Sequence, residues 1–339
     1  MIKNVFVGFL VIAVSCVVWF EWNLRPVSRT EGDKRLVIIE QGGSMKSVAS
    51  ALKREGLVRS QLAVLLYGKQ AGVEAKIKAG RYALAPSLSV REIVAILVSG
   101  SVDQQSVTIP EGFTVTQIDA LLARSGIGKP GDFIRCAFSC DVSTFAFIPN
   151  KNPGGDNSEF GSKVEGYLFP ETYFINPSSY NPEQLLQRMI LTFDQRIRST
   201  YAQEIRGSTR SLEDIITMAS LVEEESRHDE ERAVIAGILW KRLDEGIALG
   251  VDASVRYLTS KQSQSLTKND LAEDSPYNTR KFKGLPPGPI TNPGESSIVA
   301  TLNPTVSDYY YYLHDSAGNI HYAKTNDEHN ANKVRYLRR

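Results

Sequence analysis

The sequence predicts an α+β protein in three parts: an N-terminal transmembrane helix, a small α/β module and a larger α+β domain. Three observations support this prediction. The chain begins with a long uncharged run, short apolar strands alternate with capped amphipathic helices, and the composition is that of a globular protein. Of the 339 residues, 42% are hydrophobic and 23% are charged, which excludes wholesale disorder and a protein with many membrane spans.

The uncharged run covers residues 5–20 and ends near Trp19 and Trp22. At about 1.5 Å per helical residue it spans roughly 24 Å, and apolar flanks with interfacial tryptophans extend it toward the roughly 30 Å of a hydrocarbon core. We therefore expect a membrane anchor over residues 1–25, with Lys3 favouring a cytoplasmic N-terminus, and a polar tether over residues 26–35. A cleaved signal peptide without an Ala-x-Ala site and a lipidated Cys16 are the alternatives. All three place the rest of the chain outside the cytoplasm.

The charges nearly balance, with 39 Lys and Arg against 38 Asp and Glu. This balance argues against nucleic acid as a partner, because nucleic-acid binding depends on excess positive charge. Cys136 and Cys140 lie four residues apart, and in an oxidising compartment they either form a disulfide or remain as two buried thiols. Their spacing is not that of a metal site, and the chain has neither a metal motif nor a cofactor motif.

The small module is predicted over residues 36–105. Residues 36–39 and 78–84 read as strands, and Ser44, Ser60 and Ser89 stand where they can cap the helices that follow them. The larger domain is predicted over residues 106–339. It begins with a strand and a helix capped by Thr114 and contains a loop over residues 146–163, rich in Pro, Gly, Asn and Asp. Amphipathic helices are expected over residues 182–201, from residue 212 and over residues 229–245.

The helix from residue 212 carries three consecutive glutamates, Glu223, Glu224 and Glu225. At 100° per residue, the apolar stripe of this helix lies opposite Glu224, which is therefore expected in solvent. Glu223 points toward packed surroundings and Glu225 lies at the other margin of the stripe. A carboxyl group among apolar neighbours holds its proton more tightly, which suits a general acid. The alternative is a surface acidic cluster in which one glutamate pairs with Arg227 or Arg232.

Four further segments of the sequence are distinctive: residues 165–173 (EGYLFPETY), 219–225 (ASLVEEE), 275–279 (SPYNT) and 284–290 (GLPPGPI). Together they resemble the YceG-like family of endolytic murein transglycosylases. Residues 78–82, 108–112 and 326–330 also fit, so the resemblance runs through nearly the whole chain. Departures from the family pattern are Gly250-Val251 before Asp252, in place of Gln-Thr, and Arg280 in place of an aromatic residue after Asn-Thr.

The resemblance implies a LysM-like subdomain after the anchor and a C-terminal catalytic domain. It also implies that the catalytic glutamate is Glu223, a choice between Glu223 and Glu225 that the helical wheel left open. The substrate-binding residues that we expect are Glu225, Asp252, Tyr277, Asn278, Thr279 and Tyr167. The activity implied is cleavage of the MurNAc–GlcNAc β-1,4 bond within peptidoglycan glycan strands, with formation of 1,6-anhydroMurNAc ends. One carboxyl group suffices for this reaction, because the 6-hydroxyl of the muramic acid attacks its own C1 and so gains the effective molarity of an intramolecular step.

The implied protein is a single-span protein of the inner membrane with an extracytoplasmic catalytic domain. Its expected partners are peptidoglycan strands and the membrane, with peptidoglycan synthases or penicillin-binding proteins as further candidates, and no cofactor or metal is expected. Two alternatives stay open: a non-catalytic peptidoglycan-binding membrane protein, and a muramidase that hydrolyses with two carboxylates, Glu223 as acid and Asp252 as base.

Overall fold

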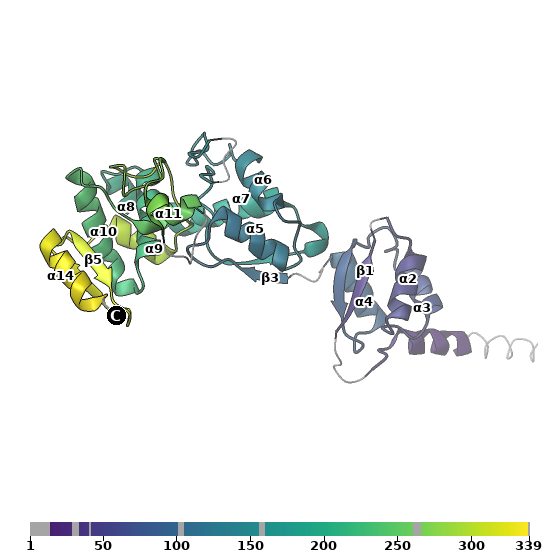
Figure 1. The fold of residues 1–339 in the computed structure, drawn as a ribbon. Coiled ribbons are helices and arrows are strands. Elements are labelled where there is room, and N and C mark those ends of the chain that lie inside the picture. The colour runs from purple at the N-terminus through teal and green to yellow at the C-terminus, as the bar shows by residue number, and fades with distance from the viewer. Residues whose placement is uncertain are drawn as a thin grey trace, which may run out of the picture. The chain divides into compact units, whose positions relative to one another are not determined.

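The computed structural model describes residues 14–28, 34–40, 42–100, 105–155, 160–259 and 266–337, and its described part is an α+β structure, as the sequence predicts (Figure 1). The chain divides into two compact units. Unit 1 contains residues 1–106 and 174–180, and unit 2 contains residues 107–173 and 181–339.

The prediction of an N-terminal transmembrane helix is wrong. In the part of the chain that the structure describes, no helix is both long enough and apolar enough to cross a membrane. The described helical residues at this end of the chain are residues 14–24, which rise only about 16 Å along a helix axis. Residues 1–13, where the predicted segment begins, lie outside the described residues.

Unit 1 is built around an antiparallel pair of strands, β1 (Arg35–Ile39) and β2 (Gly80–Leu84), in which Val37 lies opposite Tyr82. Val37 and Ile39 are buried, whereas Leu36 and Ile38 are exposed, so β1 has the period of two of a strand with one covered face. The helices of this unit are α2 (Met45–Arg54), α3 (Gln61–Gln70) and α4 (Val90–Ser99). A short 3-10 helix, Pro177–Ser179, also belongs to unit 1.

The helices of unit 1 begin where the sequence predicts. Ser44, Ser60 and Ser89 each accept a hydrogen bond from a backbone N–H of the first turn, and Ser89 forms a full capping box with Glu92. These caps satisfy N–H groups that have no partner within the helix. The buried faces of the three helices share one hydrophobic core with β1 and β2.

Unit 2 is mainly helical. Its strands β5 (Tyr311–His314) and β6 (Ile320–Ala323) pair with each other. Strands β3 (Gln105–Thr108) and β4 (Thr172–Ile175) also pair, and both lie where the chain passes from one unit to the other. The helices are α5 (Val115–Arg124), α6 (Asp132–Ser139), α7 (Pro182–Phe193), α8 (Ala202–Gly207), α9 (Leu212–Glu225), α10 (Asp229–Asp244), α11 (Asp252–Thr259), α12 (Lys268–Leu271), α13 (Glu295–Leu302) and α14 (Asn326–Tyr336).

The core of unit 2 lies where α9, α10 and α13 pack against one another. Met218 and Val222 of α9 and Leu239 of α10 are fully buried in its main hydrophobic cluster. The helix predicted over residues 182–201 is α-helical only as far as Phe193, where α7 ends. It is followed directly by a π-helical segment, Asp194–Ser199. The α9–α10–α13 packing fixes the backbone on which the candidate site is built.

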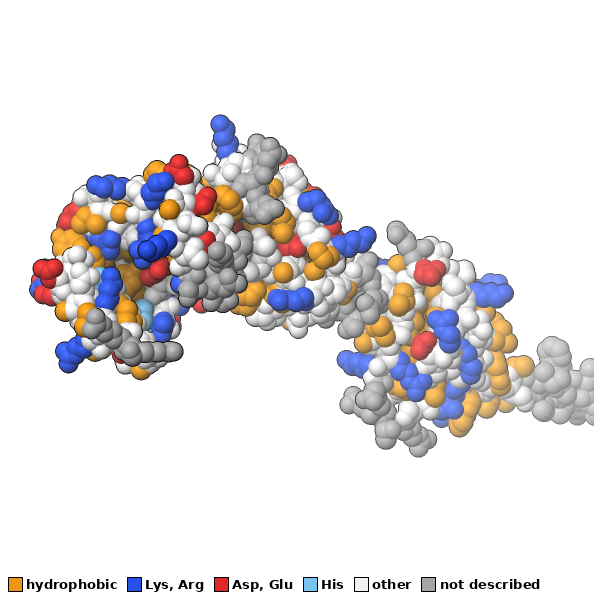
Figure 2. All heavy atoms as spheres, viewed as in Figure 1, with side chains coloured by type: hydrophobic (Ala, Val, Ile, Leu, Met, Phe, Trp, Pro, Cys, Tyr) orange, Lys and Arg blue, Asp and Glu red, His pale blue; other side chains and the backbone are white. Residues whose placement is uncertain are grey.

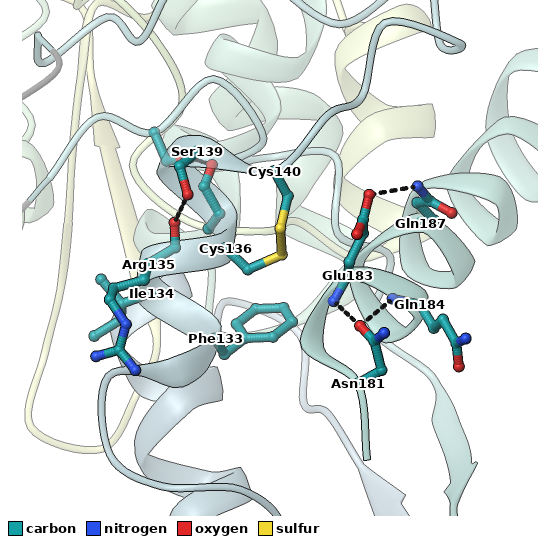
Figure 3. The surroundings of a disulfide bond; sticks show 12 residues. Phe133, Ile134, Arg135, Cys136, Ser139, Cys140, Asn181, Glu183, Gln184 and Gln187 are labelled. Atoms are coloured by element: carbon teal, nitrogen blue, oxygen red, sulfur yellow. Dashed lines mark hydrogen bonds between the residues drawn. A yellow bond between two sulfur atoms is a disulfide. The ribbon is translucent and has the colours of Figure 1, made fainter. Parts of the chain in front are cut away.

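The structure contains a disulfide between Cys136 and Cys140, which the sequence left undecided (Figure 3). Cys136 lies in α6 and Cys140 is the residue that ends this helix, and the Cys140 N–H also donates to the Cys136 carbonyl. Figure 3 places the disulfide close to Phe133 and to the start of α7, where Asn181 accepts hydrogen bonds from the backbone of Glu183 and Gln184.

Candidate active site

Glu223 lies near the C-terminal end of α9, and its side chain is only 9% exposed. Its Oε2 atom accepts a hydrogen bond from the Gly294 N–H at 3.0 Å and from Ser297 Oγ at 2.7 Å. Arg232 Nη1 lies 3.2 Å from the same oxygen. The wheel prediction that Glu223 points inward is confirmed, and so is the ion pair with Arg232 that the sequence left as an alternative.

The groups around Oε2 come from three elements of the α9–α10–α13 core. Gly294 caps the N-terminus of α13 and Ser297 lies in its first turn, so the partial positive charge of this helix end also faces the carboxylate. Arg232 of α10 lies between Glu223 and Asp229 and also donates to Ser297 Oγ. Because all of these donors meet at Oε2, that oxygen is held in place, whereas Oε1 has no hydrogen-bond partner among the described residues.

A second carboxyl group, that of Glu111, lies beside this arrangement. A Cβ placed on Gly294 would be 2.1 Å from the Glu111 carboxyl, so only a glycine allows the two residues to approach this closely. Desolvation and repulsion from Glu223 raise the pKa of Glu111, although Arg232 opposes the shift. Gly112, the next residue, has a positive φ of 75° and adjoins Glu223 and Glu224. Residues 108–112 fit the family pattern, but no role was predicted for Glu111.

The next two glutamates of α9, Glu224 and Glu225, have different surroundings from Glu223. Glu224 is exposed, as the helical wheel predicts. Neighbouring atoms exclude water from the carboxyl group of Glu224. This desolvation, together with repulsion from Glu223 and Glu225, raises the pKa of Glu224 to about 7. Burial raises the pKa of Glu225 to about 6, partly offset by a hydrogen bond that Tyr312 donates at 3.0 Å. Both groups therefore change charge close to neutral pH.

Two clefts open beside these glutamates. The larger one has a volume of about 390 Å³ and includes Glu224, Glu225 and Asp252 in its lining. The smaller one, about 110 Å³, is lined by Gly112, Thr291 and again Glu224. Arg256 also lines both clefts, so the two share a boundary at Glu224 and Arg256. Glu223 lines neither cleft, but its Cγ adjoins Gly112 at the wall of the smaller one.

The structure distributes the other expected binding residues between the cleft and the core. Glu225 and Asp252 line the larger cleft, and Asp252 pairs with Arg280. The remaining four are buried and line neither cleft: Tyr167, Tyr277, Asn278 and Thr279.

These four residues make their contacts in the interior of unit 2. Asn278 donates to the carbonyls of Leu271 and Glu273, and Thr279 accepts from the Val251 N–H just before Asp252. The ring of Tyr277 packs in an aromatic cluster with Phe160 and Tyr257, and the ring of Tyr167 packs against Phe147 and Phe193.

A buried polar group at Glu165 ties the segment that carries Gly294 to α5. Glu165 accepts hydrogen bonds from Asn292 Nδ2, Tyr257 Oη and the Val115 N–H at the start of α5. Asn292 in turn accepts from two backbone N–H groups, those of Gly166 and Leu168. Burial raises the pKa of Glu165 to about 8. This network fixes the backbone two residues before the Gly294 N–H that binds Glu223.

The groups that sequence reasoning missed come from distant parts of the chain. Gly294 and Ser297 meet Glu223 across more than 70 positions of sequence, with separations of 71 and 74. The Pro-Gly before α13 was a signal for a helix start, but it did not indicate which carboxylate that start would face. Among the described residues, the structure has no group of three or more His, Cys, Asp or Glu side chains arranged to hold a metal ion.

Comparisons with a family profile, with curated proteins and with solved structures all indicate the same family. The profile of the YceG-like family matches residues 37–335. A relative from Bacillus subtilis (strain 168), named endolytic murein transglycosylase, is 34% identical over 328 residues, which are 93% of this chain and 88% of the relative. A relative of the same name from Streptococcus pneumoniae (strain D39) is 30% identical over 93% of this chain, but the match covers only 60% of that longer protein.

A solved structure also matches. The crystal structure of a putative YceG-like protein from Listeria monocytogenes superposes with a TM-score of 0.59 at 29% sequence identity. The match covers 89% of this chain and 99% of that one.

Proposed function

This chain belongs to the YceG-like family, and on that premise we propose that it is an endolytic murein transglycosylase acting on the cell wall. The reaction is cleavage of the MurNAc–GlcNAc β-1,4 bond within peptidoglycan glycan strands, which leaves 1,6-anhydroMurNAc ends. The observation that carries the proposal is the setting of Glu223: one carboxyl oxygen is fixed by three donors and the other has no partner within the described part of the chain.

In this mechanism Glu223 acts first as a general acid and then as a general base. Protonated at Oε1, it donates its proton to the glycosidic oxygen as the bond from this oxygen to C1 of MurNAc breaks. The 6-hydroxyl of the same MurNAc then attacks C1, and Glu223 takes up the hydroxyl proton. The new C1–O6 bond closes the anhydro ring, water is not consumed, and Glu223 is again protonated.

The surroundings of Glu223 suit both steps. The donors at Oε2 stabilise the carboxylate that remains after proton donation, and they keep Oε1 in one position for the return of the proton. The Cγ atom of Glu223 adjoins Gly112 at the wall of the smaller cleft, and we propose that the sugar enters there. Glu225 and Asp252 are the residues of our expected set that line the larger cleft, and we assign substrate contacts to them.

A second candidate reaction is hydrolysis by two carboxyl groups. The Glu111 carboxyl is the observation that favours it, because it lies against Gly294, whose N–H binds Glu223. In that reaction one group protonates the leaving oxygen while the other activates water. Glu111 interacts electrostatically with Glu223, whereas Asp252 is paired with Arg280 in the larger cleft, which Glu223 does not line.

Product analysis distinguishes the reactions. Purified glycan strands are incubated with the protein, and the new ends are identified by chromatography and mass spectrometry. Anhydro ends, lighter than reducing ends by one water, are expected. Reducing MurNAc ends would establish the hydrolase instead, and binding without new ends would establish a non-catalytic peptidoglycan-binding protein.

Two finer parts of the proposal concern the rest of the chain. We assign residues 36–105 to a LysM-like glycan-binding subdomain and residues 106–339 to the catalytic domain; the separate hydrophobic core of unit 1 supports the first assignment. As the glycan contact we propose a small cavity of about 160 Å³, lined by residues of β1 and α2 that include Arg54. Arg54→Glu in the full chain should weaken sedimentation with insoluble peptidoglycan, and unchanged sedimentation would contradict this role. Peptidoglycan synthases are the partners we propose.

A further inference from the structure

From the charges that line the larger cleft, we infer that it binds the free carboxylates of the stem peptides that branch from the glycan strand. The inference rests on the proposed function, and it names the part of the substrate that the cleft recognises. Its basis is a set of cationic side chains that converge on the cleft next to Glu224. We call this set the cationic cluster, and its members are Arg227, Arg242, Arg256, Arg280 and Lys333.

Positive charge exceeds negative charge in this cleft. Its lining contains the five members of the cationic cluster and three carboxyl groups, those of Glu224, Glu225 and Asp252. The carboxyl groups of Glu224 and Glu225, with pKa values of about 7 and about 6, are partly protonated near neutral pH, which increases the excess. A cavity of about 390 Å³ is within the usual size range of ligand sites.

Two members of the cluster already have partners. Arg280 Nε pairs with Asp252. The guanidinium of Arg242 donates to the carbonyls of Ala248 and Tyr310, so its charge is buried against backbone oxygens. These two contacts shape the cleft and leave the other three cations for a ligand.

Arg227, Arg256 and Lys333 have no carboxylate within ion-pair distance among the described residues. Arg227 has one long contact, 3.5 Å to the Asp315 carbonyl. The three side chains come from the segment between α9 and α10, from α11 and from α14, and yet all line one cleft. Figure 2 shows Lys and Arg side chains, with a His, around a hollow in the surface of unit 2. Such converging, unpaired cations are suited to bind an anionic group.

The position of the cluster fits a branch of the substrate better than its sugar backbone. MurNAc and GlcNAc rings carry no charge, so a neutral glycan gives these cations no partner. The stem peptide begins at the lactyl group of MurNAc and carries free carboxylates. Because Arg256 lies at the boundary between the two clefts, a strand bound with its MurNAc near Glu223 can extend its stem into the larger cleft.

The test compares two substrates and three proteins. Glycan strands with intact stems and strands stripped of stems by an amidase are digested by the native protein, by Lys333→Gln and by Arg335→Gln. Arg335 is the matched control, because it is exposed on the same helix, two residues from Lys333, and does not line the cleft.

The native protein should cleave intact strands with a kcat/KM at least tenfold higher than stripped strands. Lys333→Gln should lower this ratio several-fold, chiefly through the KM for intact strands, and Arg335→Gln should leave it unchanged. Equal kcat/KM on both substrates for the native protein would overturn the inference. A loss in Lys333→Gln that is the same for both substrates would overturn it as well.

Two further substrates show whether the cationic cluster recognises stem carboxylates, other parts of the peptide, or phosphate. Strands whose stem carboxylates have been converted to carboxamides should behave like stripped strands, and retained preference for them would show that peptide contacts other than charge are recognised. Strands freed of phosphate-containing wall polymers should keep the preference, and its loss would assign the cluster to phosphate.

A binding measurement distinguishes failure of this inference from failure of the proposed function. A soluble stem tetrapeptide is titrated against native protein, Lys333→Gln and Arg335→Gln by calorimetry. Weaker binding to Lys333→Gln alone is expected even if no strand is cleaved, in which case only the transglycosylase assignment fails. Equal binding to all three proteins, or no binding, would refute the carboxylate site.

Discussion

The contact between Gly294 and Glu111 provides a sharp test of the catalytic arrangement. The Gly294 N–H donates to Glu223 Oε2 at 3.0 Å, and a Cβ on Gly294 would lie 2.1 Å from the Glu111 carboxyl. The substitution Gly294→Ala therefore adds one methyl group where the backbone that holds Glu223 meets a second carboxyl. No positive φ is involved, so the effect is steric.

The size of the effect follows from the overlap. Ordinary van der Waals contact begins near 3.4 Å, so a contact of 2.1 Å requires a displacement of about 1.3 Å (3.4 − 2.1). If the Gly294 backbone moves by this amount, its hydrogen bond to Glu223 is broken, which costs about 1.5–3 kcal/mol for a bond to a charged group. If the Glu111 side chain moves instead, it leaves its position beside Glu223. A displacement of about 1 Å in the backbone that positions Glu223 costs about 100-fold in rate, whereas movement of the Glu111 side chain alone leaves Glu223 in place.

We expect Gly294→Ala to lower the rate of new-end formation on glycan strands by about 10–100-fold, with a melting temperature within a few degrees of native. Gly207→Ala is the matched control, because a Cβ there has no neighbour within 4 Å. The double variant Gly294→Ala/Glu111→Ala, measured beside Glu111→Ala alone, should recover activity if the backbone moved. Equal activity of Gly294→Ala and Gly207→Ala would refute the reasoning.

Three further predictions concern stability. Gly237→Ala should lower the free energy of unfolding by about 1–3 kcal/mol in denaturant titrations, because its Cβ would lie 2.0 Å from the backbone oxygen of Thr305; a change no larger than that of Gly207→Ala would contradict this. Burial raises the pKa of Glu165 from 4.5 to about 8, so folding takes up a proton in this range and its contribution to stability should fall by about 1 kcal/mol per pH unit between about pH 5 and 8. This slope should disappear in Glu165→Gln, and an equal slope in both proteins would be evidence against a buried acid. Replacing Cys136 and Cys140 by serine should cost about 2 kcal/mol, as expected for closure of so short a loop, and native stability in reducing agent would count against this.

Local sequence patterns predicted the local structure well. The serine and threonine caps identified the starts of α2, α3, α4 and α5, since each cap satisfies N–H groups within one turn. The helical wheel of α9 placed Glu224 in solvent and Glu223 inward, because the period of a helix depends on its own residues alone. The N-terminal transmembrane helix was predicted by composition alone and is the part of the fold that was wrong.

The chemistry of the site depends on contacts that local patterns do not contain. The wheel gave the direction of Glu223, and Arg232 was named only as one of two possible partners of a glutamate in this cluster. Gly294 and Ser297 were not predicted, because they follow about 70 positions later. Desolvation alone suggested an acid among apolar groups, whereas the structure surrounds one of its oxygens with donors. Lys333 was not among the predicted site residues, and only the packing of unit 2 brings it to the larger cleft.

The central claim is that Glu223 carries the proton that opens the glycosidic bond. Its most direct test is the initial rate of anhydro-end formation by Glu223→Gln and by Glu224→Gln, each measured by mass spectrometry on the same strands. An amide in place of Glu223 should lower the rate by about 100- to 10,000-fold, as for loss of a general acid and base, while both proteins stay folded and bind the strands. The neighbouring substitution should cost less than tenfold. Anhydro ends formed by Glu223→Gln at a rate close to native would contradict the account.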